Sequence, residues 1–455
     1  MFENIIAQDA ALQLREDINS RRLAPSMLFF GPAASGKGSA ALELARVLSC
    51  EKSGAWNCGC PACARHRALL HGDVLMLGRR NFLAEIAACR SIMAREFAAS
   101  QKTNTAATPE AKTLAMTPFI RSIRKLTARF SPVLWEDDSK IGKLAANLQA
   151  IEEALNDLEQ LGANTESNDD SKMGSVEKLC DSLLKNAASL EDEGMSATVP
   201  INQIRRASYW GRLAPQGKRK TLIIENADRM QEGARNCLLK ILEEPPDLLN
   251  IVLCAQRKET IMDTLLSRLR PYRFIKRNPE QEACVIRRIF KDAREASTSM
   301  GLGAYIDSFL PQPLEKLNTL AAFFVLSLAH VTSLSAKQAN SEIIGFLNAL
   351  EQHCGPIAKT GGLEKAASAG DACGKVLAES GNFEGRTFSS FLKLCLDLVL
   401  QSVQKAGVHP FAIGYIDMWR KNAAQADAAM GIWYQSPALA MEAFFYRLKK
   451  EMLEA

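Results

Sequence analysis

The sequence lacks long hydrophobic runs. No apolar stretch of about 18 residues, the length that marks a candidate transmembrane helix, occurs among its 455 residues. The first residues, Met1-Phe2-Glu3-Asn4, also lack the basic and apolar regions of a signal peptide. We therefore expect a cytoplasmic protein that makes no contact with a membrane.

A strong excess of either charge is also absent. The 56 Lys and Arg residues nearly balance the 51 Asp and Glu residues, which leaves a net charge of +5. This mild charge permits contact with nucleic acid but does not argue for it. The chain of 455 residues is too long for one hydrophobic core, so we expect roughly two to four domains.

Disulfides are not expected in the cytoplasm, so the twelve cysteines should be thiols or metal ligands. Eight are scattered, and we expect them to be buried as small apolar residues. These are Cys89, Cys180, Cys237, Cys254, Cys284, Cys354, Cys373 and Cys395.

The other four cysteines, Cys50, Cys58, Cys60 and Cys63, form one cluster. Four thiolates in a Gly- and Pro-interrupted segment suit a tetrahedral Zn²⁺ that staples a loop. His66 is an alternative ligand, and a reduced loop without metal is the alternative interpretation. In either case the site is expected to be structural.

The stretch from Phe29 to Lys37 has the pattern of a P-loop. A hydrophobic strand over Met27–Phe30 and an Ala- and Leu-rich helix to about Cys50 flank it. In such a loop, glycines aim backbone N–H groups at phosphate oxygens and a lysine neutralises the β/γ charge. The predicted phosphate-binding residues are Gly31, Ser35, Gly36 and Lys37. The alternative is a Gly-rich turn without a ligand.

The residue after the lysine departs from the P-loop pattern. A hydroxyl that binds Mg²⁺ is expected there, but the residue is Gly38. Ser39 is one residue further, about 100° around the helix, and is expected to point away. The sequence therefore predicts a loop that holds phosphate without properly holding the metal.

Residues 79–199 differ in composition, because Ala, Leu, Lys and Glu dominate and glycine is sparse. Apolar residues between Leu144 and Leu158 fall at helical spacing. Another helix is expected over Val176–Leu190, after a polar link at Gly162–Gly174. We expect a helical insertion that forms a protruding arm, with partner binding as its function if it has one.

An α/β pattern returns after Val199. The run Thr221–Ile224 predicts a central parallel strand, and acidic residues after such a strand hold Mg²⁺ and its water. Glu225 can still carry charge to the metal, but Asn226 cannot accept a proton, so a general base is missing. Asp228 is expected to be a helix N-cap. The basic turn 217–220 fits DNA phosphates or solvent about equally.

A helix over Gly233–Glu244, a buried strand over Asn250–Ala255 and a helix from about Glu259 to the 267–271 region follow. Gln256, at the tip of the strand, is placed to contact a γ-phosphate or a water. Arg268 follows the last helix, where an arginine can act as a finger for a neighbouring subunit. The alternative is an ordinary surface arginine.

Together these motifs resemble bacterial DNA polymerase III clamp-loader subunits of the AAA+ superfamily. The run Leu-Leu-Lys-x-Leu-Glu-Glu-Pro-Pro is the most specific. The segments that carry the resemblance are Phe2–Gln8, Leu28–Pro32, the cysteine cluster, Leu238–Pro246 and Leu266–Arg268.

The resemblance implies an AAA+ α/β P-loop domain with a parallel sheet, a small helical lid and an all-α collar. Its implied parts are 1–78, which includes the zinc module 50–63; the insertion 79–199; the second half of the core, 200–275; the lid, 276–325; and the collar, 326–455.

The resemblance also implies a function. The family forms a hetero-pentamer that binds ATP between subunits, opens the sliding clamp and places it on primed DNA. Its Ser-Arg-Cys motif supplies the arginine finger in trans; here Ser267 and Arg268 are kept and the cysteine is Leu269. The zinc cluster is a family feature, although its spacing here is one residue short.

Within the family, gamma/tau subunits hydrolyse ATP and delta-prime subunits often do not. Gly38, Glu225, Asn226 and the strand tip Ala255-Gln256 all depart from the active pattern. We therefore favour a delta-prime-like stator that binds ATP, hydrolyses it weakly or not at all, and lends Arg268 to a neighbour. The alternatives are a gamma/tau-type motor and a zinc-stapled scaffold that does not bind nucleotide.

Overall fold

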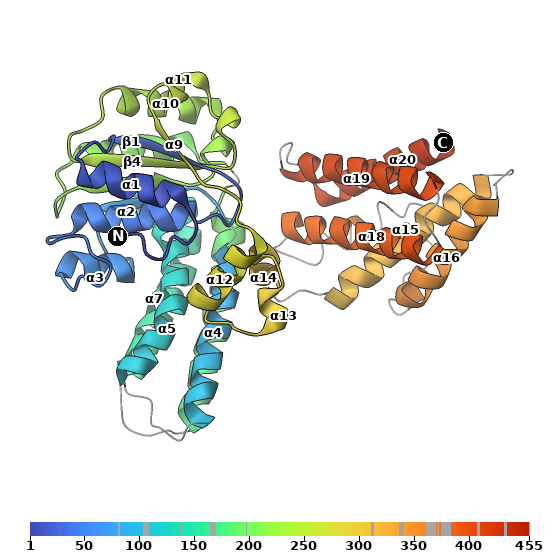
Figure 1. Cartoon of the computed structure of the whole chain (residues 1–455), viewed down its shortest axis with the longest axis horizontal. Helices are drawn as coiled ribbons and strands as arrows, with labels where there is room; N and C mark the ends of the chain where they lie inside the picture. The colour runs from blue at the N-terminus through green and yellow to red at the C-terminus, as the bar shows by residue number, and fades with distance from the viewer. Residues whose placement is uncertain are drawn as a thin grey trace. The chain divides into compact units, whose positions relative to one another are not determined.

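The computed structural model divides the chain into two compact units, Met1–Leu310 and Pro311–Ala455 (Figure 1). It describes all residues except 81, 103–108, 137, 164–169, 197, 311–313, 336–340, 360–369, 371–372, 375–383, 407–409, 432–434 and 455.

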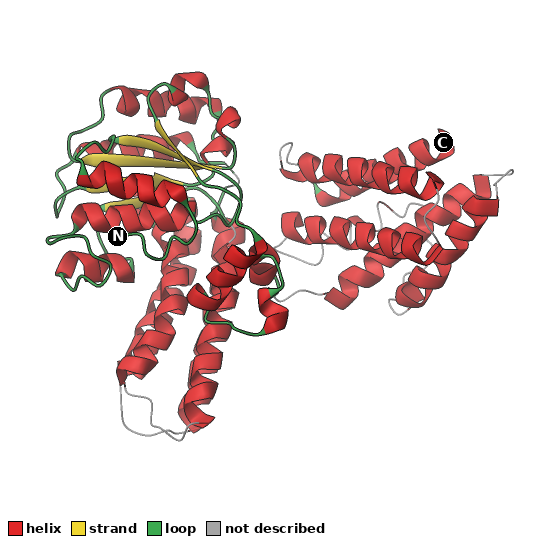
Figure 2. Ribbon diagram, viewed as in Figure 1, coloured by secondary structure: helices red, strands yellow, loops and turns green. Residues whose placement is uncertain are grey.

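The first unit is built on a parallel five-stranded sheet with the order β2-β3-β4-β1-β5 (Figure 2). The strands are β1 (Ser26–Phe30), β2 (Val74–Leu77), β3 (Lys220–Ile224), β4 (Leu249–Ala255) and β5 (Arg270–Arg273). This parallel sheet with flanking helices confirms the predicted α/β fold class.

Both faces of the sheet are covered, which explains the continuous apolar runs of β3 and β4. Ile223 and Val252 belong to a core shared with the helices next to the P-loop. Leu222, Ile224 and Leu253 belong to a second core on the opposite face. Successive side chains of a strand point to opposite faces, so the parts of a strand that lie between two cores are apolar on both faces.

Helices α1, α2, α3, α9, α10 and α11 surround the sheet. Their bounds are Asp9–Asn19, Lys37–Ser49, Pro61–Ala68, Ile201–Arg212, Glu232–Glu243 and Asp263–Leu266. The short helices η3 and η4 cover Ala227–Arg229 and Lys258–Thr260.

The insertion is helical, as predicted. Its helices are α4 (Phe82–Lys102), α5 (Pro109–Thr127), η1 (Ala128–Phe130), α6 (Pro132–Trp135), α7 (Lys140–Ala163), α8 (Asp170–Ser189) and η2 (Leu190–Gly194). Helices α4, α5 and α7 run side by side away from the sheet (Figure 1). Residues 164–169 of the predicted link lie outside the described residues.

The insertion is more than a protruding arm, however. Phe82, Phe119 and Leu183 are buried in the same core as the sheet residues Leu222 and Leu253. On another side, Ala88 and Ile92 of α4 pack in a core with the lid residues Val285, Ile286 and Tyr305. The insertion therefore covers one face of the sheet and supports the lid.

Two strands were missed from the sequence, and one predicted helix is wrong. β5 and the short helices η4 and α11 replace most of the helix expected from Glu259. β5 has four residues, exposes three of them and contains Pro271. Proline is confined to edge strands because it cannot donate to a ladder, so the segment has no strand signal of its own.

The lid consists of α12 (Pro279–Ile289), α13 (Glu295–Thr298) and α14 (Leu302–Asp307). A capping box between Asn278 and Gln281 begins α12. The lid belongs to the first compact unit, which ends at Leu310. The expected boundary between 325 and 326 falls inside α15, where the chain is one continuous helix.

The described part of the second unit is helical. Its helices are α15 (Leu314–Ser335), α16 (Ser341–Lys359), α18 (Glu384–Ala406), α19 (Pro410–Gly431) and α20 (Pro437–Glu454). Phe324, Trp419 and Phe444 pack against one another at its centre. This agrees with the all-α collar of the predicted fold class.

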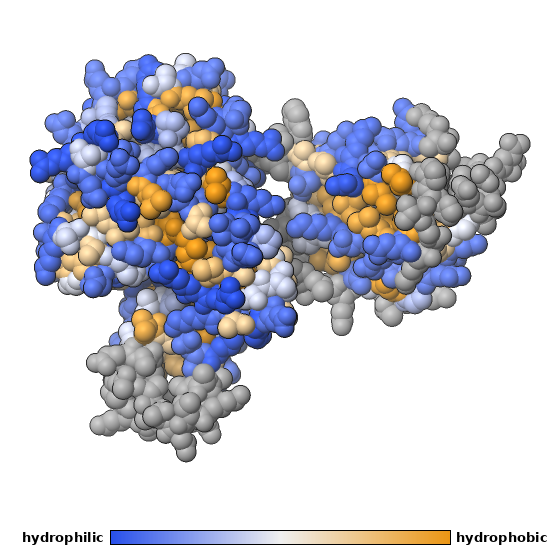
Figure 3. All heavy atoms as spheres, in the orientation of Figure 1, coloured by the Kyte–Doolittle hydropathy of each residue, from blue (hydrophilic) through white to orange (hydrophobic). Residues whose placement is uncertain are grey.

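None of the described helices combines the length and hydrophobicity that crossing a bilayer requires. Polar and charged side chains cover most of the visible face of the first unit, and only small hydrophobic areas interrupt them (Figure 3).

Candidate nucleotide and metal sites

The predicted P-loop connects β1 to α2. Gly31 and Gly36 have φ angles of +149° and +98°, a region that L side chains rarely adopt. A Cβ on Gly31 would also lie 2.0 Å from the backbone oxygen of Phe274. Glycine is thus required at both positions, and the loop ends at the amino terminus of α2, where N–H groups suit an anion.

Lys37 folds back over its own loop. Its Nζ donates to the carbonyl oxygens of Gly31 and Pro32, each at 2.6 Å, and lies 3.3 Å from Ser35 Oγ. Ser35 is buried and donates to Pro32 O at 2.8 Å. Burial lowers the pKa of Lys37, and the charges of Asp228 and Glu225 oppose that shift. The loop, the helix terminus and the lysine therefore fit a phosphate group.

The carboxylate of Glu225 lies where a side chain at position 38 would be. A Cβ built on Gly38 would lie 2.3 Å from Glu225 Oε1. The position from which a hydroxyl would bind Mg²⁺ is thus filled by the carboxylate of Glu225. Ser39 is exposed on α2.

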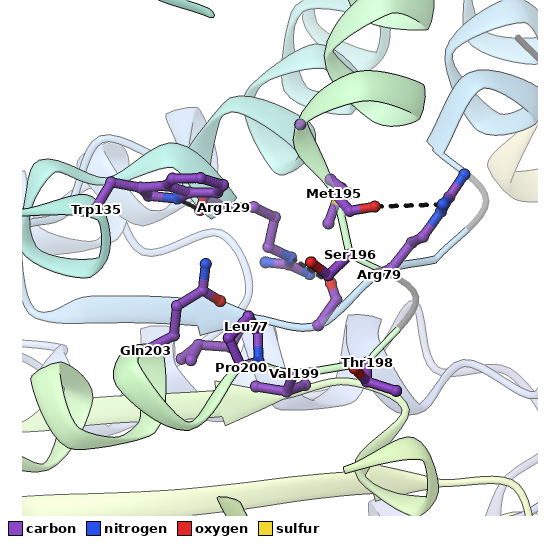
Figure 4. Close-up of a pocket in the computed structure, with 12 residues that line it drawn as sticks. Leu77, Arg79, Arg129, Trp135, Met195, Ser196, Thr198, Val199, Pro200 and Gln203 are labelled. Atoms are coloured by element: carbon purple, nitrogen blue, oxygen red, sulfur yellow. Dashed lines mark hydrogen bonds between the residues drawn. The ribbon is translucent and has the colours of Figure 1, made fainter. Parts of the chain in front are cut away.

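Two arginines of the insertion hold Glu225. Arg129 Nη2 is paired with Glu225 Oε2, and Arg80 Nη1 lies 3.5 Å from Oε1. Arg129 extends from η1 to the end of β2, where its Nε donates to Gly78 O at 3.2 Å (Figure 4). Burial would raise the pKa of Glu225, but the charges of Arg80 and Arg129 outweigh it and keep the pKa below its ordinary value.

Further ion pairs hold Arg80. Glu85 is paired with both Arg80 and Lys125. The guanidinium carbons of Arg80 and Arg129 lie 5.1 and 5.3 Å from the ring centre of the buried Phe82. With the carboxylate paired and no hydroxyl at position 38, these residues do not fit a magnesium site of the usual P-loop kind.

Asn226 stands where a catalytic base is expected, but its side chain is engaged elsewhere. Its Nδ2 donates to the backbone oxygen of Arg79. Asp228 is not the predicted N-cap of α10, because that position is Gln231. It lies inside η3, and its buried Oδ1 has no hydrogen-bond partner in the described part of the chain. Gln256 is exposed just beyond β4.

The three cations of the basic turn at 217–220 donate hydrogen bonds to neighbouring segments. Lys218 Nζ donates to Cys50 O at 2.6 Å, and Lys220 Nζ donates to Trp210 O at 2.7 Å. Arg219 donates to Asn250 Oδ1 at 3.0 Å. All three cations therefore tie neighbouring segments together.

The structure brings together the four clustered cysteines. All four are buried, and their sulfur atoms lie within 4.8 Å of one another. Cys50 Sγ is 3.6 Å from Cys58 Sγ and 3.9 Å from Cys60 Sγ. Sulfurs about 2.3 Å from a tetrahedral Zn²⁺ are roughly 3.8 Å apart. The cluster therefore fits zinc, which would staple the loop after α2 to the start of α3.

The surroundings favour a thiolate at Cys60, whereas burial and the neighbouring thiols raise the pKa of Cys63 to about 12. Burial raises the pKa of Cys60, but hydrogen bonds from the backbone N–H groups of Cys63 and Glu51 outweigh it and lower the pKa to about 6. Arg46 Nη1 lies 3.0 Å from Cys63 Sγ. His66, the alternative ligand, is not part of the cluster, and its ring stacks on His71 at 4.1 Å.

Comparison with known proteins decides the family. The family model described as "DNA polymerase III, delta subunit" matches residues 6–158 and 133–278, which together span more than half of the chain. The chain belongs to the DNA polymerase III delta subunit family. This confirms the predicted clamp-loader subunit.

The other comparisons add little. A solved structure of a DNA polymerase III gamma subunit-related protein from Thermotoga maritima matches 56% of this chain and 81% of its own at 17% identity. The TM-score of that match is 0.27, too low to support an argument. A search of curated proteins found no match.

In this clamp-loader subunit, Arg268 lies away from the P-loop of its own chain. It precedes Arg270, which pairs with Met27 at the amino end of β1, whereas the P-loop follows the carboxyl end of that strand. Arg268 Nη2 lies 2.8 Å from Glu243 Oε1, and Nη1 donates to Thr264 O at 2.6 Å. Arg268 is exposed between α11 and β5.

Sequence reasoning missed three arginines of this site. Besides Arg80 and Arg129, Arg277 reaches the P-loop: its Nη1 donates to Ala34 O at 2.9 Å, and its Nε donates to Ile6 O at 2.9 Å. A Cβ on Gly36 would lie 3.3 Å from its Nη2. Arg80 and Arg277 follow β2 and β5, the two strands that were missed, so recognising those strands would have placed both near the loop.

Proposed function

We propose that this chain is a delta-prime-like stator of the clamp loader. It binds ATP at Gly31–Lys37 with little or no hydrolysis, and it presents Arg268 to the neighbouring subunit of a hetero-pentamer. That assembly opens the sliding clamp and places it on primed DNA. The cysteine cluster binds one Zn²⁺ and has a structural role.

One observation carries the proposal: the carboxylate of Glu225 fills the space beside Gly38 and is paired with Arg129 and Arg80. The carboxylate is therefore not available to hold a metal and its water. The engaged side chain of Asn226 supports the same conclusion, because a missing base costs about 10²–10⁴-fold in rate.

The test is ATP turnover. A motor subunit is expected to turn over ATP on the order of 1 s⁻¹. The purified chain with Mg²⁺, ATP and primed DNA should be at least about 100-fold slower. Turnover near 1 s⁻¹ from the isolated chain would identify a gamma/tau-type motor instead.

The finger is tested in the assembled complex. Arg268→Ala should lower hydrolysis at the neighbouring subunit by roughly 10³-fold or more, and leave the isolated chain unchanged. Arg257→Ala is a matched control, since Arg257 is also exposed beyond β4. Equal activity of complexes with Arg268→Ala and Arg257→Ala would refute the finger.

The second candidate is a scaffold that does not bind nucleotide. The contacts of Lys37 with its own loop favour it, since all three acceptors lie within that loop. Equilibrium binding of an ATP analogue separates the two functions. The stator binds saturably and loses binding on Lys37→Ala, whereas the scaffold shows no saturable binding.

A further inference from the structure

Gly38 and Glu225, which both depart from the usual P-loop pattern, lie in contact with each other and with Arg80. A Cβ on Gly38 would meet Glu225 Oε1 at 2.3 Å and Arg80 Nη1 at 3.4 Å. A side chain with a hydroxyl at position 38 and the observed placement of Glu225 therefore exclude each other. The carboxylate and guanidinium together fill the first turn of α2, beside the phosphate-binding loop.

The two arginines around Glu225 together carry the charge of the missing metal. Each oxygen of the Glu225 carboxylate faces its own guanidinium, Oε1 that of Arg80 and Oε2 that of Arg129. Two guanidinium groups carry the formal charge of one Mg²⁺. Because Arg129 is 5% exposed and Glu225 7% exposed, a metal would have to break a buried ion pair, which is costly.

The two arginines are also held in fixed positions. Nη1 of Arg129 and Nε of Arg80 are buried away from solvent and have no hydrogen-bond partner among the described residues. Glu85, Gly78 O and the face of Phe82 hold the two side chains in place. Positioned cations of this kind need no ordering when a phosphate group arrives.

We propose that Arg80 and Arg129 replace Mg²⁺ at this P-loop, so that a nucleoside di- or triphosphate binds without a metal ion. This rests on the proposed nucleotide binding. The helical insertion, which supplies both arginines, is then part of the nucleotide site. Mg²⁺ normally neutralises the β- and γ-phosphates, and here fixed guanidinium groups provide that neutralisation.

Calorimetric titration of the full chain with ATP and with ADP tests the inference, once with Mg²⁺ and once in buffer freed of Mg²⁺ without a chelator, so that the zinc stays bound. For at least one nucleotide, we expect the two dissociation constants to agree within about threefold, a difference below 1 kcal/mol. Loss of about tenfold or more without Mg²⁺ for every nucleotide that binds would overturn the inference and leave the proposed nucleotide binding intact. No saturable binding in either buffer would overturn both.

A variant then tests the role of Arg80. Arg80→Met frees Glu225 Oε1, so the affinity without Mg²⁺ should fall about tenfold or more and Mg²⁺ should restore part of it. Arg79→Met is the matched control: the neighbouring Arg79 pairs with Asp192 instead. Arg80→Lys keeps the charge and should keep most of the binding without Mg²⁺. If Arg80→Met binds as Arg79→Met does without Mg²⁺, Arg80 has no such role.

Discussion

The two ends of helix α2 differ in the metal ligands that they offer. At its amino end, Gly38 offers no ligand and Glu225 is paired with arginines. At its carboxyl end, Cys50 joins three other thiols within 4.8 Å. The amino end thus lacks a usual magnesium site, whereas the carboxyl end offers four thiols whose spacing fits Zn²⁺.

The same helix joins the two ends physically. Arg46, near the end of α2, contacts Cys63 Sγ at 3.0 Å and Gly54 O at 2.8 Å. It also forms a buried ion pair at 2.7 Å with Glu43, which accepts from the backbone N–H of Phe2. The cysteine loop is thus anchored to the helix that begins at the P-loop.

The largest effect is expected at the cysteine end. Cys60→Ser should lower bound zinc from about one per chain to a small fraction, because a structural site needs all four ligands. Each kcal/mol of lost unfolding free energy lowers the thermal midpoint of a domain this size by roughly 2–4 °C. We expect the midpoint of Cys60→Ser to fall by about 10 °C or more. Elemental analysis and thermal unfolding measure the two quantities.

Cys284→Ser is the control for that experiment, because Cys284 lies in α12, outside the cluster. It should keep its zinc and its midpoint. A native chain purified without zinc, or Cys60→Ser with unchanged stability, would remove the contrast between the two ends of α2.

The next effect is expected at the P-loop end and needs no metal. Arg129→Met leaves Glu225 Oε2 buried without a cation, and breaking a buried pair costs roughly 3–5 kcal/mol. Urea unfolding followed by fluorescence measures the loss. The double variant Arg129→Met with Glu225→Gln should recover part of it, since the unpaired charge is gone. A loss below about 1 kcal/mol for Arg129→Met would mean that the pair is not important for stability.

The contrast also shows what could be predicted from the sequence. The P-loop, the cysteine cluster and strands β1, β3 and β4 carry their signal in short contiguous segments, and all were placed correctly. Arg80 and Arg129 lie 145 and 96 residues from their partner Glu225. No local pattern links such residues, because the contact exists only once the insertion packs on the sheet.

The stability of the chain in acid should depend on Glu85, which is paired with Arg80 and Lys125. Burial raises the pKa of Glu85, but the charges of Arg80 and Lys125 outweigh it and lower the pKa from 4.5 to about 2. A lowered folded pKa gives stability that is present above pH 4.5 and is lost as the pH falls toward 2. This amounts to about 3 kcal/mol at neutral pH.

Unfolding of the native chain and of Glu85→Gln at several pH values tests this expectation. The difference between them should be full near pH 7 and shrink as the pH falls from about 4.5 to about 2. Loss of zinc in acid affects both chains equally and cancels. A difference that stays constant over this range would show that Glu85 is not held as a carboxylate by its cations.

The smallest effect concerns the link between the two ends. Arg46→Lys keeps the charge but loses the fork that reaches Glu43, Gly54 O and Cys63 Sγ together. Changes to groups that support metal ligands typically cost about 10–100-fold in metal affinity, so zinc should pass to a chelator that much more readily. Arg65→Lys is the control, since Arg65 is exposed on α3. Both variants could instead release zinc at the same chelator concentration as the native chain. The cysteine loop would then hold its metal independently of α2, and the two ends of the helix would be separate sites.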